Sequence, residues 1–250
     1  ASIAKKFFDS KFGFSVNKSH EVFRNCYYGG RTEVYNFNKD EIPLYVYDVN
    51  SMYPYVMKTF EYISPGDLSK VVNPPKNIFL DILDKYEGFA KVNVYHKKVK
   101  IPILPYRTEQ KLLFPAGYFT TYVTFPEIRK FLEYDLGEVQ VDCLYYGERI
   151  STPFAKFVDY CFEKRKQSDF HNLVYKLIMN SLYGKYGEKD KEIKIYSETY
   201  IPGRYKKVDK TKSGFVFTKE EIKEVENMVS IAAYITAYSR LTLYEYMRKF

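Results

Sequence analysis

Residues 45–57 read YVYDVNSMYPYVM, which places a single acid, Asp48, at the end of an apolar run. The run LYVYDV, residues 44–49, is short and rich in β-branched and aromatic residues, with Pro43 before it and a Ser-Met-Tyr-Pro turn after it. This pattern predicts a β-strand that ends near Asp48. A carboxylate held at a strand end, beside backbone carbonyls, is a suitable Mg²⁺ ligand. The same position also suits an Asx turn or a helix cap.

A second informative segment, KLIMNSLYGKYG, covers residues 176–187. The Thr-Pro pair at 152–153 and Ser168 favour two helix starts, so residues 151–187 are predicted to form two antiparallel helices. Helical spacing separates an apolar set from a polar set on the second helix. The apolar set is Val174, Leu177, Ile178, Ser181 and Leu182, and the polar set is Asp169, Asn172, Lys176, Asn180 and Tyr183.

The polar face of this predicted helix carries a candidate phosphate clamp, Lys176. Asn180 and Tyr183 add an amide and an aromatic ring to the same face, and Gly184 allows a ligand to approach the backbone closely. A lysine opposite an apolar stripe is also commonly part of a solvated face. The residues alone leave both interpretations open.

Composition limits the class of protein. The chain has 250 residues, 46% of them hydrophobic, which is enough for one large domain or two small ones. Its formal net charge of +8 and its 27 Tyr and 20 Phe favour a nucleic-acid partner, because cations hold phosphates and rings stack on bases. Three widely spaced cysteines argue against a disulfide framework or a zinc site and favour a reducing, intracellular location. No run approaches the roughly 20 apolar residues of a membrane span, so no membrane contact is predicted.

The other segments differ in pattern. Residues 60–150 contain alternating strand-like runs among seven prolines, which predicts a separate α+β insertion. Within it, TFPEIRKFLEYDLG at 124–137 predicts a short capped helix. The paired glycines of YYGG, residues 27–30, predict a tight turn flanked by strands. The charged residues 188–226 predict a solvated hairpin or loop, and residues 226–250 a capped, periodic helix.

DVNSMYP, residues 48–54, and KLIMNSLYGKYG resemble the first two conserved polymerase motifs of family B DNA polymerases, in the order of that family. The resemblance is greatest to the protein-primed branch of bacteriophages and linear plasmids, including mitochondrial ones. YYGG resembles the Tyr-x-Gly-Gly motif of that branch, and the insertion lies where the branch carries its terminal-protein region. The resemblance implies an α+β fold with an antiparallel palm sheet, helical fingers and an α+β terminal-protein insertion. The implied divisions are 1–59 for the first part of the palm, 60–150 for the insertion, 151–187 for the fingers helices, 188–226 for a charged hairpin or loop, and 227–250 for a palm helix that leads to a third motif.

By this resemblance, the function is template-directed DNA synthesis by two-metal nucleotidyl transfer with Mg²⁺, for which Mn²⁺ is an alternative. Asp48 is implied to be a catalytic, metal-binding carboxylate, with the Val49 carbonyl as a further ligand. Lys176 is the implied catalytic cation on the triphosphate. It is supported by Arg165, or by Lys166 if the turn between the helices shifts the register.

Other roles follow from the same resemblance. Tyr53 is expected under the sugar, where its ring excludes a 2′-hydroxyl. Asn172 lies where some relatives have a second lysine, which weakens the expected phosphate clamp. The remaining expected contacts are Ser51, Asn180 and Tyr183 with the nucleotide, and Tyr27, Gly29, Gly30, Gly184 and Lys185 with DNA.

The expected partners are primer-template DNA, deoxynucleoside triphosphates and a terminal priming protein, in the host cytoplasm or the mitochondrial matrix. The third motif of the family, Asp-Thr-Asp on a β-hairpin, has no counterpart, because Asp190 and Asp209 lie in charged, loop-like sequence. The chain is therefore expected to be a fragment that does not extend a primer unaided. The alternative is a non-catalytic module with the same fold that binds nucleic acid or terminal protein.

Overall fold

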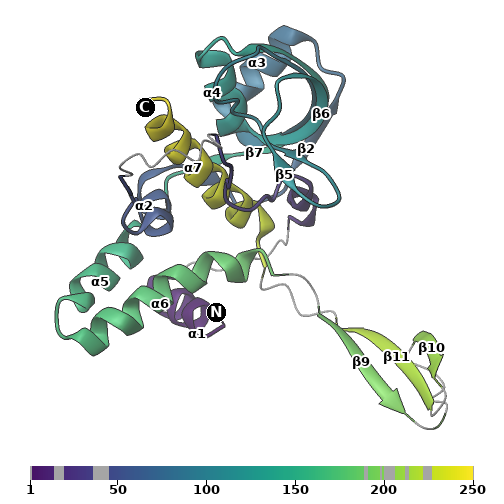
Figure 1. Cartoon of the computed structure of the whole chain (residues 1–250). Helices are drawn as coiled ribbons and strands as arrows, with labels where there is room; N and C mark the ends of the chain where they lie inside the picture. The colour runs from purple at the N-terminus through teal and green to yellow at the C-terminus, as the bar shows by residue number, and fades with distance from the viewer. Residues whose placement is uncertain are drawn as a thin grey trace.

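The computed structural model describes residues 2–13, 20–35, 45–188, 191–197, 199, 206–211, 214–221 and 227–249. The helices are α1 Ser2–Phe12, the 3₁₀ helix η1 Glu21–Asn25, α2 Met52–Thr59, α3 Lys76–Lys85, α4 Phe125–Glu133, α5 Ala155–Arg165, α6 Asp169–Tyr186 and α7 Val229–Met247. The strands are β1 Tyr62–Ile63, β2 Ser69–Val72, β3 Glu87–His96, β4 Tyr106–Arg107, β5 Leu112–Leu113, β6 Gly117–Thr124, β7 Gly137–Gly147, β8 Arg149–Ile150, β9 Lys191–Ser197, β10 Lys206–Thr211 and β11 Gly214–Glu221. Helices and antiparallel strands occur in separate layers, so the predicted α+β class is confirmed (Figure 1).

The segment predicted as an α+β insertion contains a four-stranded antiparallel sheet in the order β2-β7-β3-β6. Along β3 the side chains alternate as a half-buried strand requires, since Val92 and Val94 are buried while Tyr95 is 40% exposed. Helix α4 packs against this sheet and begins with the predicted cap. Thr124 and Glu127 form a capping box there, which satisfies two of the free N–H groups at the helix start.

Helix α7 occupies the centre of the molecule, between the four-stranded sheet and the helices α2 and α6 (Figure 1). All residues from Val229 to Leu241 are buried, so this predicted helix is enclosed on every side over most of its length. Its predicted side-chain cap is wrong, because Met228 occupies the N-cap position and the Asn227 amide donates to the Glu188 carbonyl at 2.8 Å.

The sheet is joined to α7 by buried polar contacts. The Tyr234 hydroxyl of α7 accepts from the Gly88 N–H at 2.6 Å and donates to Glu87 at 2.8 Å. Glu87 is 1% exposed and also pairs with Arg129 at 2.7 Å. Burial raises the pKa of the Glu87 carboxyl, which these donors oppose. The insertion therefore shares one continuous core with the rest of the chain and is not a detached unit.

Helices α5 and α6 form the predicted antiparallel pair. Ser168 caps α6 as expected, by accepting from the His171 N–H at 3.2 Å. The start of α5 is two residues beyond the predicted Thr-Pro pair, because Thr152 turns inward and donates to the Met57 carbonyl. Helix α1 packs against both helices, and its Phe8 and Phe12 rings contact the Phe157 ring of α5.

One prediction for α6 is wrong, because Leu177 was assigned to the buried side and is 60% exposed. Phe170 and Leu173, one to two turns earlier, are also exposed, at 72% and 58%. The described neighbours α1, α2, α5 and α7 leave this side of the helix uncovered, so its apolar residues face solvent there.

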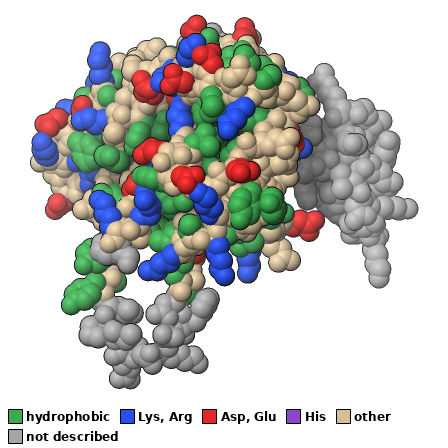
Figure 2. All heavy atoms as spheres, turned by 90° about the horizontal axis from the view of Figure 1, so that it is seen from above, with side chains coloured by type: hydrophobic (Ala, Val, Ile, Leu, Met, Phe, Trp, Pro, Cys, Tyr) green, Lys and Arg blue, Asp and Glu red, His purple; other side chains and the backbone are tan. Residues whose placement is uncertain are grey.

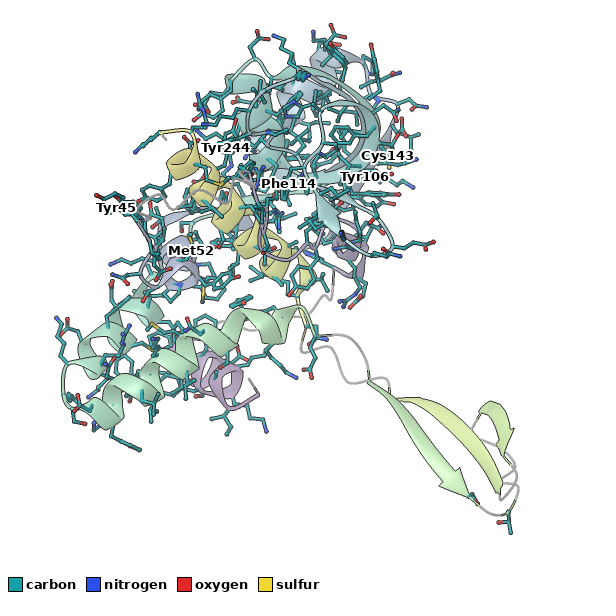
Figure 3. The ribbon with its side chains drawn as sticks, in the orientation of Figure 1. Tyr45, Met52, Tyr106, Phe114, Cys143 and Tyr244 are labelled. Atoms are coloured by element: carbon teal, nitrogen blue, oxygen red, sulfur yellow. The ribbon has the colours of Figure 1, made fainter. Side chains whose placement is uncertain are left out.

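Residues 45–49 are not a β-strand, which corrects the prediction for the part of that run that the structure describes. Tyr45, Val46 and Tyr47 are 81%, 94% and 77% exposed. Figure 3 shows Tyr45 at the outer edge of the molecule. A strand exists only through hydrogen bonds to a partner, and no described strand pairs with this segment. The strands expected beside YYGG are likewise absent from residues 20–35, where the 3₁₀ helix η1 precedes an irregular turn.

The charged segment after α6 contains the predicted hairpin, with a third strand added. Strands β9 and β11 pair antiparallel, β10 pairs with β11, and the three-stranded sheet extends away from the rest of the chain (Figure 1). Asp190, judged solvated from the sequence, lies outside the described residues. Among the described helices, none combines the length and the apolarity that a membrane crossing requires.

Candidate nucleotide-binding site

An open pocket of about 650 Å³ lies where the start of α2, the end of α5 and the polar face of α6 meet. Most of the side chains that the sequence singled out for a nucleotide are gathered there. Its lining residues are Asp48, Asn50, Ser51, Met52, Tyr53, Phe162, Arg165, Lys176, Asn180 and Tyr183. The pocket therefore combines one acid, two cations, two amides and three aromatic rings from segments more than a hundred residues apart.

The first turn of α2 forms one wall of this pocket. Ser51 precedes the helix with a positive φ of 55°, and its carbonyl accepts from the Tyr55 N–H at 2.9 Å. The left-handed conformation is unfavourable for a residue with a Cβ and turns the chain sharply from Asp48 into the helix. The N–H groups of Met52 and Tyr53, at the start of the helix, have no partner within it, and both residues line the pocket.

Two tyrosines from different helices stack at the pocket. The rings of Tyr53 on α2 and Tyr183 on α6 are 4.2 Å apart between centroids, at an interplanar angle of 24°. Burial and the neighbouring Tyr53 hydroxyl raise the pKa of Tyr183. The two stacked rings are flat surfaces suited to contact with a sugar or a base.

The two cations of the pocket come from α5 and α6. Lys176 is exposed and has no hydrogen bond or ion pair to another residue in the described part of the chain. Arg165 donates from Nε to Asn172 Oδ1 at 2.8 Å, so the asparagine at the expected lysine position holds the guanidinium instead. Nη1 of Arg165 is buried and has no hydrogen-bond partner among the described residues, which leaves a strong donor unsatisfied there. Such an orphaned donor at a pocket favours an anionic ligand.

Asp48 contributes the carboxylate of the pocket. It is exposed and makes no hydrogen bond or ion pair to another described residue. No group of three His, Cys, Asp or Glu is close enough to form a protein-only metal centre within the described ranges. Mg²⁺ is commonly held by one or two carboxylates together with substrate phosphates. Asp48 therefore fits a Mg²⁺ ion shared with a triphosphate, whereas Val49, the other predicted ligand, is not among the residues that line the pocket.

The Tyr27–Gly30 turn lies next to this pocket. A Cβ added to Gly30 would be 3.9 Å from the Tyr53 hydroxyl. The Tyr27 ring packs on Gly187 after the end of α6, where an added Cβ would come within 2.5 Å of it. Gly29 and Gly30 are both exposed, so a strand of nucleic acid has access to the backbone of the turn.

Besides the Tyr27–Gly30 turn, four predicted residues do not line the pocket: Val49, Lys166, Gly184 and Lys185. Lys166 pairs with Glu163 at 2.8 Å, so Arg165 is the cation that the geometry favours. Gly184 is exposed on α6 with open space around its Cα. Lys185 is 2% exposed and forms an ion pair with Glu188. The charge of Lys185 is therefore engaged inside the fold, and its contact with DNA stays a prediction.

Sequence reasoning missed Asn50, Met52 and Phe162 as lining residues. Asn50 and Met52 lie inside the DVNSMYP motif, between residues that were predicted to contact the nucleotide. Phe162 is one helical turn before Arg165, and the guanidinium carbon lies 5.2 Å from its ring centroid. The i, i+3 spacing was the available signal for this pair.

Charge over the wider surface is mixed. Figure 2 shows Lys and Arg side chains interspersed with Asp and Glu on the face it presents. The net charge of +8 is therefore not concentrated in one basic patch on that face. The local cations of the pocket, and not a broad basic surface, distinguish the candidate site.

Comparison with known proteins gives concordant matches. The profile of the family described as DNA polymerase type B, organellar and viral, matches residues 2–250. A probable DNA polymerase of Neurospora intermedia is 27% identical over 94% of this chain and 26% of its own length. The DNA-directed DNA polymerase of Enterobacteria phage PRD1 is 29% identical over 72% of this chain and 31% of its own length. The chain thus spans about a quarter of the length of the first of these relatives.

The fold is also shared with a solved polymerase. Phi29 DNA polymerase, in a complex with primer-template DNA and incoming nucleotide substrates, matches with a TM-score of 0.72 and 21% identity, over 96% of this chain and 44% of that one. At this identity the likeness shows the fold alone. Because the family profile covers residues 2–250, the chain belongs to the organellar and viral family of type B DNA polymerases.

Proposed function

We propose that this chain carries the nucleotide-binding part of a template-directed DNA polymerase of the protein-primed type. The observation that carries the proposal is the gathering of Asp48, Lys176, Arg165 and the stacked tyrosines in one pocket. An acid beside two cations suits a metal-bound triphosphate, and two stacked aromatic rings suit a nucleoside. Family membership and the names of the relatives support the same reaction.

Each side chain has a distinct role in this proposal. Lys176 and the free Nη1 of Arg165 bind phosphate oxygens and orient the triphosphate. Asn180 donates a hydrogen bond from its amide to the nucleotide, and the Tyr183 ring also contacts the nucleotide. Tyr53 lies under the sugar.

Asp48, with the Val49 carbonyl, would hold Mg²⁺ or Mn²⁺. The metal, when bound, supplies charge neutralisation at the phosphates and a more reactive 3′-oxygen. The 250-residue sequence contains no Asp-x-Asp motif to supply a second carboxylate. We therefore propose that this chain alone binds nucleotide without extending a primer.

The proposed macromolecular partners are primer-template DNA and a terminal priming protein. Tyr27, Gly29 and Gly30 are placed to contact the template strand, because their turn adjoins both Tyr53 and the end of α6. The insertion at 60–150 is proposed as the terminal-protein region. The proposed location is the host cytoplasm or the mitochondrial matrix, in line with phage and fungal relatives.

The lone carboxylate also favours a second candidate, a module that binds nucleic acid or terminal protein without chemistry. The two candidates differ in metal dependence. A polymerase site binds a deoxynucleoside triphosphate more tightly with Mg²⁺ because the ion links Asp48 to the phosphates. A binding module lacks this linkage.

Calorimetric titration of a deoxynucleoside triphosphate, with and without Mg²⁺, tests the proposal. We expect Mg²⁺ to tighten binding by about tenfold or more, and Asp48→Asn to remove that gain. Glu109→Gln is the control, because Glu109 is an exposed acid outside the pocket. Equal affinities with and without Mg²⁺ would support the non-catalytic module.

A further inference from the structure

The Tyr27–Gly30 turn has no regular secondary structure and is held by side chains from distant elements. Arg107 on β4, within the insertion, donates from Nη2 to the Tyr27 carbonyl. Arg240 on α7 donates from Nη1 to the Tyr28 carbonyl at 3.2 Å and to the Gly29 carbonyl at 3.0 Å. Two arginines therefore bind three successive carbonyls of the turn.

The Tyr28 ring lies between the same two guanidinium groups. Its centroid is 4.5 Å from the Arg107 Cζ and 5.5 Å from the Arg240 Cζ. The Tyr28 hydroxyl donates to the Tyr122 carbonyl of β6 at 2.8 Å. The ring is 2% exposed, and burial raises the pKa of Tyr28 to about 12. The insertion thus contacts both the backbone and the side chain of the turn.

The two arginines differ in how firmly they are held. Arg240 is 3% exposed and pairs with the buried Glu127 at 2.7 Å, so it forms a fixed anchor. Arg107 is exposed and belongs to the short β4–β5 hairpin, whose flanks are marked by Tyr106 and Phe114 in Figure 3. Arg31, just after the turn, rests on Phe114 with its Cζ 4.0 Å from the ring centroid. Of the two arginines that hold the turn, Arg107 on the β4–β5 hairpin is therefore the less firmly fixed.

We infer that Arg107 is a positioning residue by which the insertion fixes the Tyr27–Gly30 turn for contact with a template strand. The inference rests on the proposed DNA-binding function and extends it, because it makes the insertion part of the DNA site. The turn adjoins Tyr53 through Gly30 and the end of α6 through Tyr27. A displacement of the hairpin therefore changes the DNA contact and the pocket together.

The first test is binding of a primer-template duplex at several salt concentrations, measured by fluorescence anisotropy. We expect Arg107→Ala to weaken binding about tenfold, as the loss of one charge-assisted hydrogen bond implies, with an unchanged salt slope. Arg107→Lys should restore part of the affinity, because an ammonium also donates to a carbonyl. The control is Lys111→Ala, which removes an exposed positive charge from the same hairpin away from the turn.

The salt slope separates positioning from direct contact. An arginine on a phosphate lowers the slope of log K against log salt by about 0.9 when it is removed. A reduced slope for Arg107→Ala would overturn the positioning role, as would an affinity equal to that of Lys111→Ala.

Hydrogen exchange without DNA supplies a second test. We expect faster exchange at residues 27–31 in Arg107→Ala, with exchange in α6 unchanged as a check on the fold. Unchanged exchange at 27–31 would overturn the inference. If the unmodified chain binds no primer-template, the proposed function fails, and the exchange result still decides whether Arg107 holds the turn.

Discussion

At the residue scale, the proposed function gives Tyr53 the role of selecting the sugar that the pocket accepts. Replacing Tyr53 by Val removes the ring that blocks a 2′-hydroxyl, so the preference for a deoxynucleotide over a ribonucleotide should fall about tenfold. Competition between the two triphosphates for the Mg²⁺-bound chain measures this ratio. A ratio equal to that of the unmodified chain would remove Tyr53 from this role.

Lys176 is the second residue with a measurable role. Losing a charge-assisted contact costs about 1.5–3 kcal/mol, so Lys176→Ala should weaken triphosphate binding by roughly 10- to 100-fold. Lys97→Ala is the matched control, because Lys97 is an exposed lysine paired with Asp135 in the insertion. Similar small effects for both substitutions would favour a solvated face for α6.

His96 is expected to make stability depend on pH. Nδ1 donates to the Lys97 carbonyl at 2.8 Å and Nε2 accepts from the Ile103 N–H at 3.1 Å, an arrangement that requires the neutral ring. Burial, with a smaller effect of the Arg31 charge, lowers the pKa of His96 below its ordinary value of 6.5.

Because the folded pKa is the lower one, the stabilisation from His96 is complete above 6.5 and is lost as pH falls below it. The urea midpoint should therefore drop more between about pH 8 and about pH 5 in the unmodified chain than in His96→Gln. Equal drops would show that His96 does not contribute.

The pocket residues that lie in sequence motifs could be predicted individually, where the type of side chain and its spacing indicate the same role. Asp48 and Lys176 were chosen from local sequence and Tyr53 from the family resemblance, and all three line one pocket. The motif alone did not reveal that Lys185 is buried, but its spacing of nine positions from Lys176 does. Nine positions rotate a helix by about 900°, which places Lys185 on the opposite, buried side.

At the element scale, α1 stabilises the α5–α6 pair. Phe8 is 0% exposed, and its ring centroid lies 5.2 Å from those of Phe154 and Phe157. Phe8→Ala should lower the free energy of unfolding by about 3–5 kcal/mol, the range for a fully buried ring. Ile3→Ala on the same helix, at a position 80% exposed, should change it by less than about 0.5 kcal/mol. Equal urea midpoints for the two variants would contradict this packing role.

Elements defined by local signals were predicted well. The capping box at Thr124 and the cap at Ser168 both occur as expected, because a cap depends on residues three or four positions apart. Residues 45–49 were predicted wrongly, because strand formation depends on a distant partner. The wrong prediction that Leu177 is buried has a similar cause. Periodicity shows which side of a helix is apolar, but not whether another element covers that side.

At the scale of the whole molecule, α7 and the turn at 27–30 join the insertion to the pocket. The sequence predicted the insertion as a separate unit from its prolines and alternating runs. In the structure, Glu127 of α4 forms an ion pair with Arg240, and the Gly88 N–H of β3 donates a hydrogen bond to the Tyr234 hydroxyl. These contacts join residues more than a hundred positions apart, and neither composition nor periodicity contains that information.

In a template-directed polymerase, the pocket selects a nucleotide by its fit to a template base. The direct test of this role is the affinity of each deoxynucleoside triphosphate for the chain bound to Mg²⁺ and a primer-template with a dideoxy end. We expect the complementary nucleotide to bind at least about tenfold more tightly than the others, and a change of the template base to change which nucleotide is preferred. Equal affinities for all four nucleotides, whatever the template base, would contradict it.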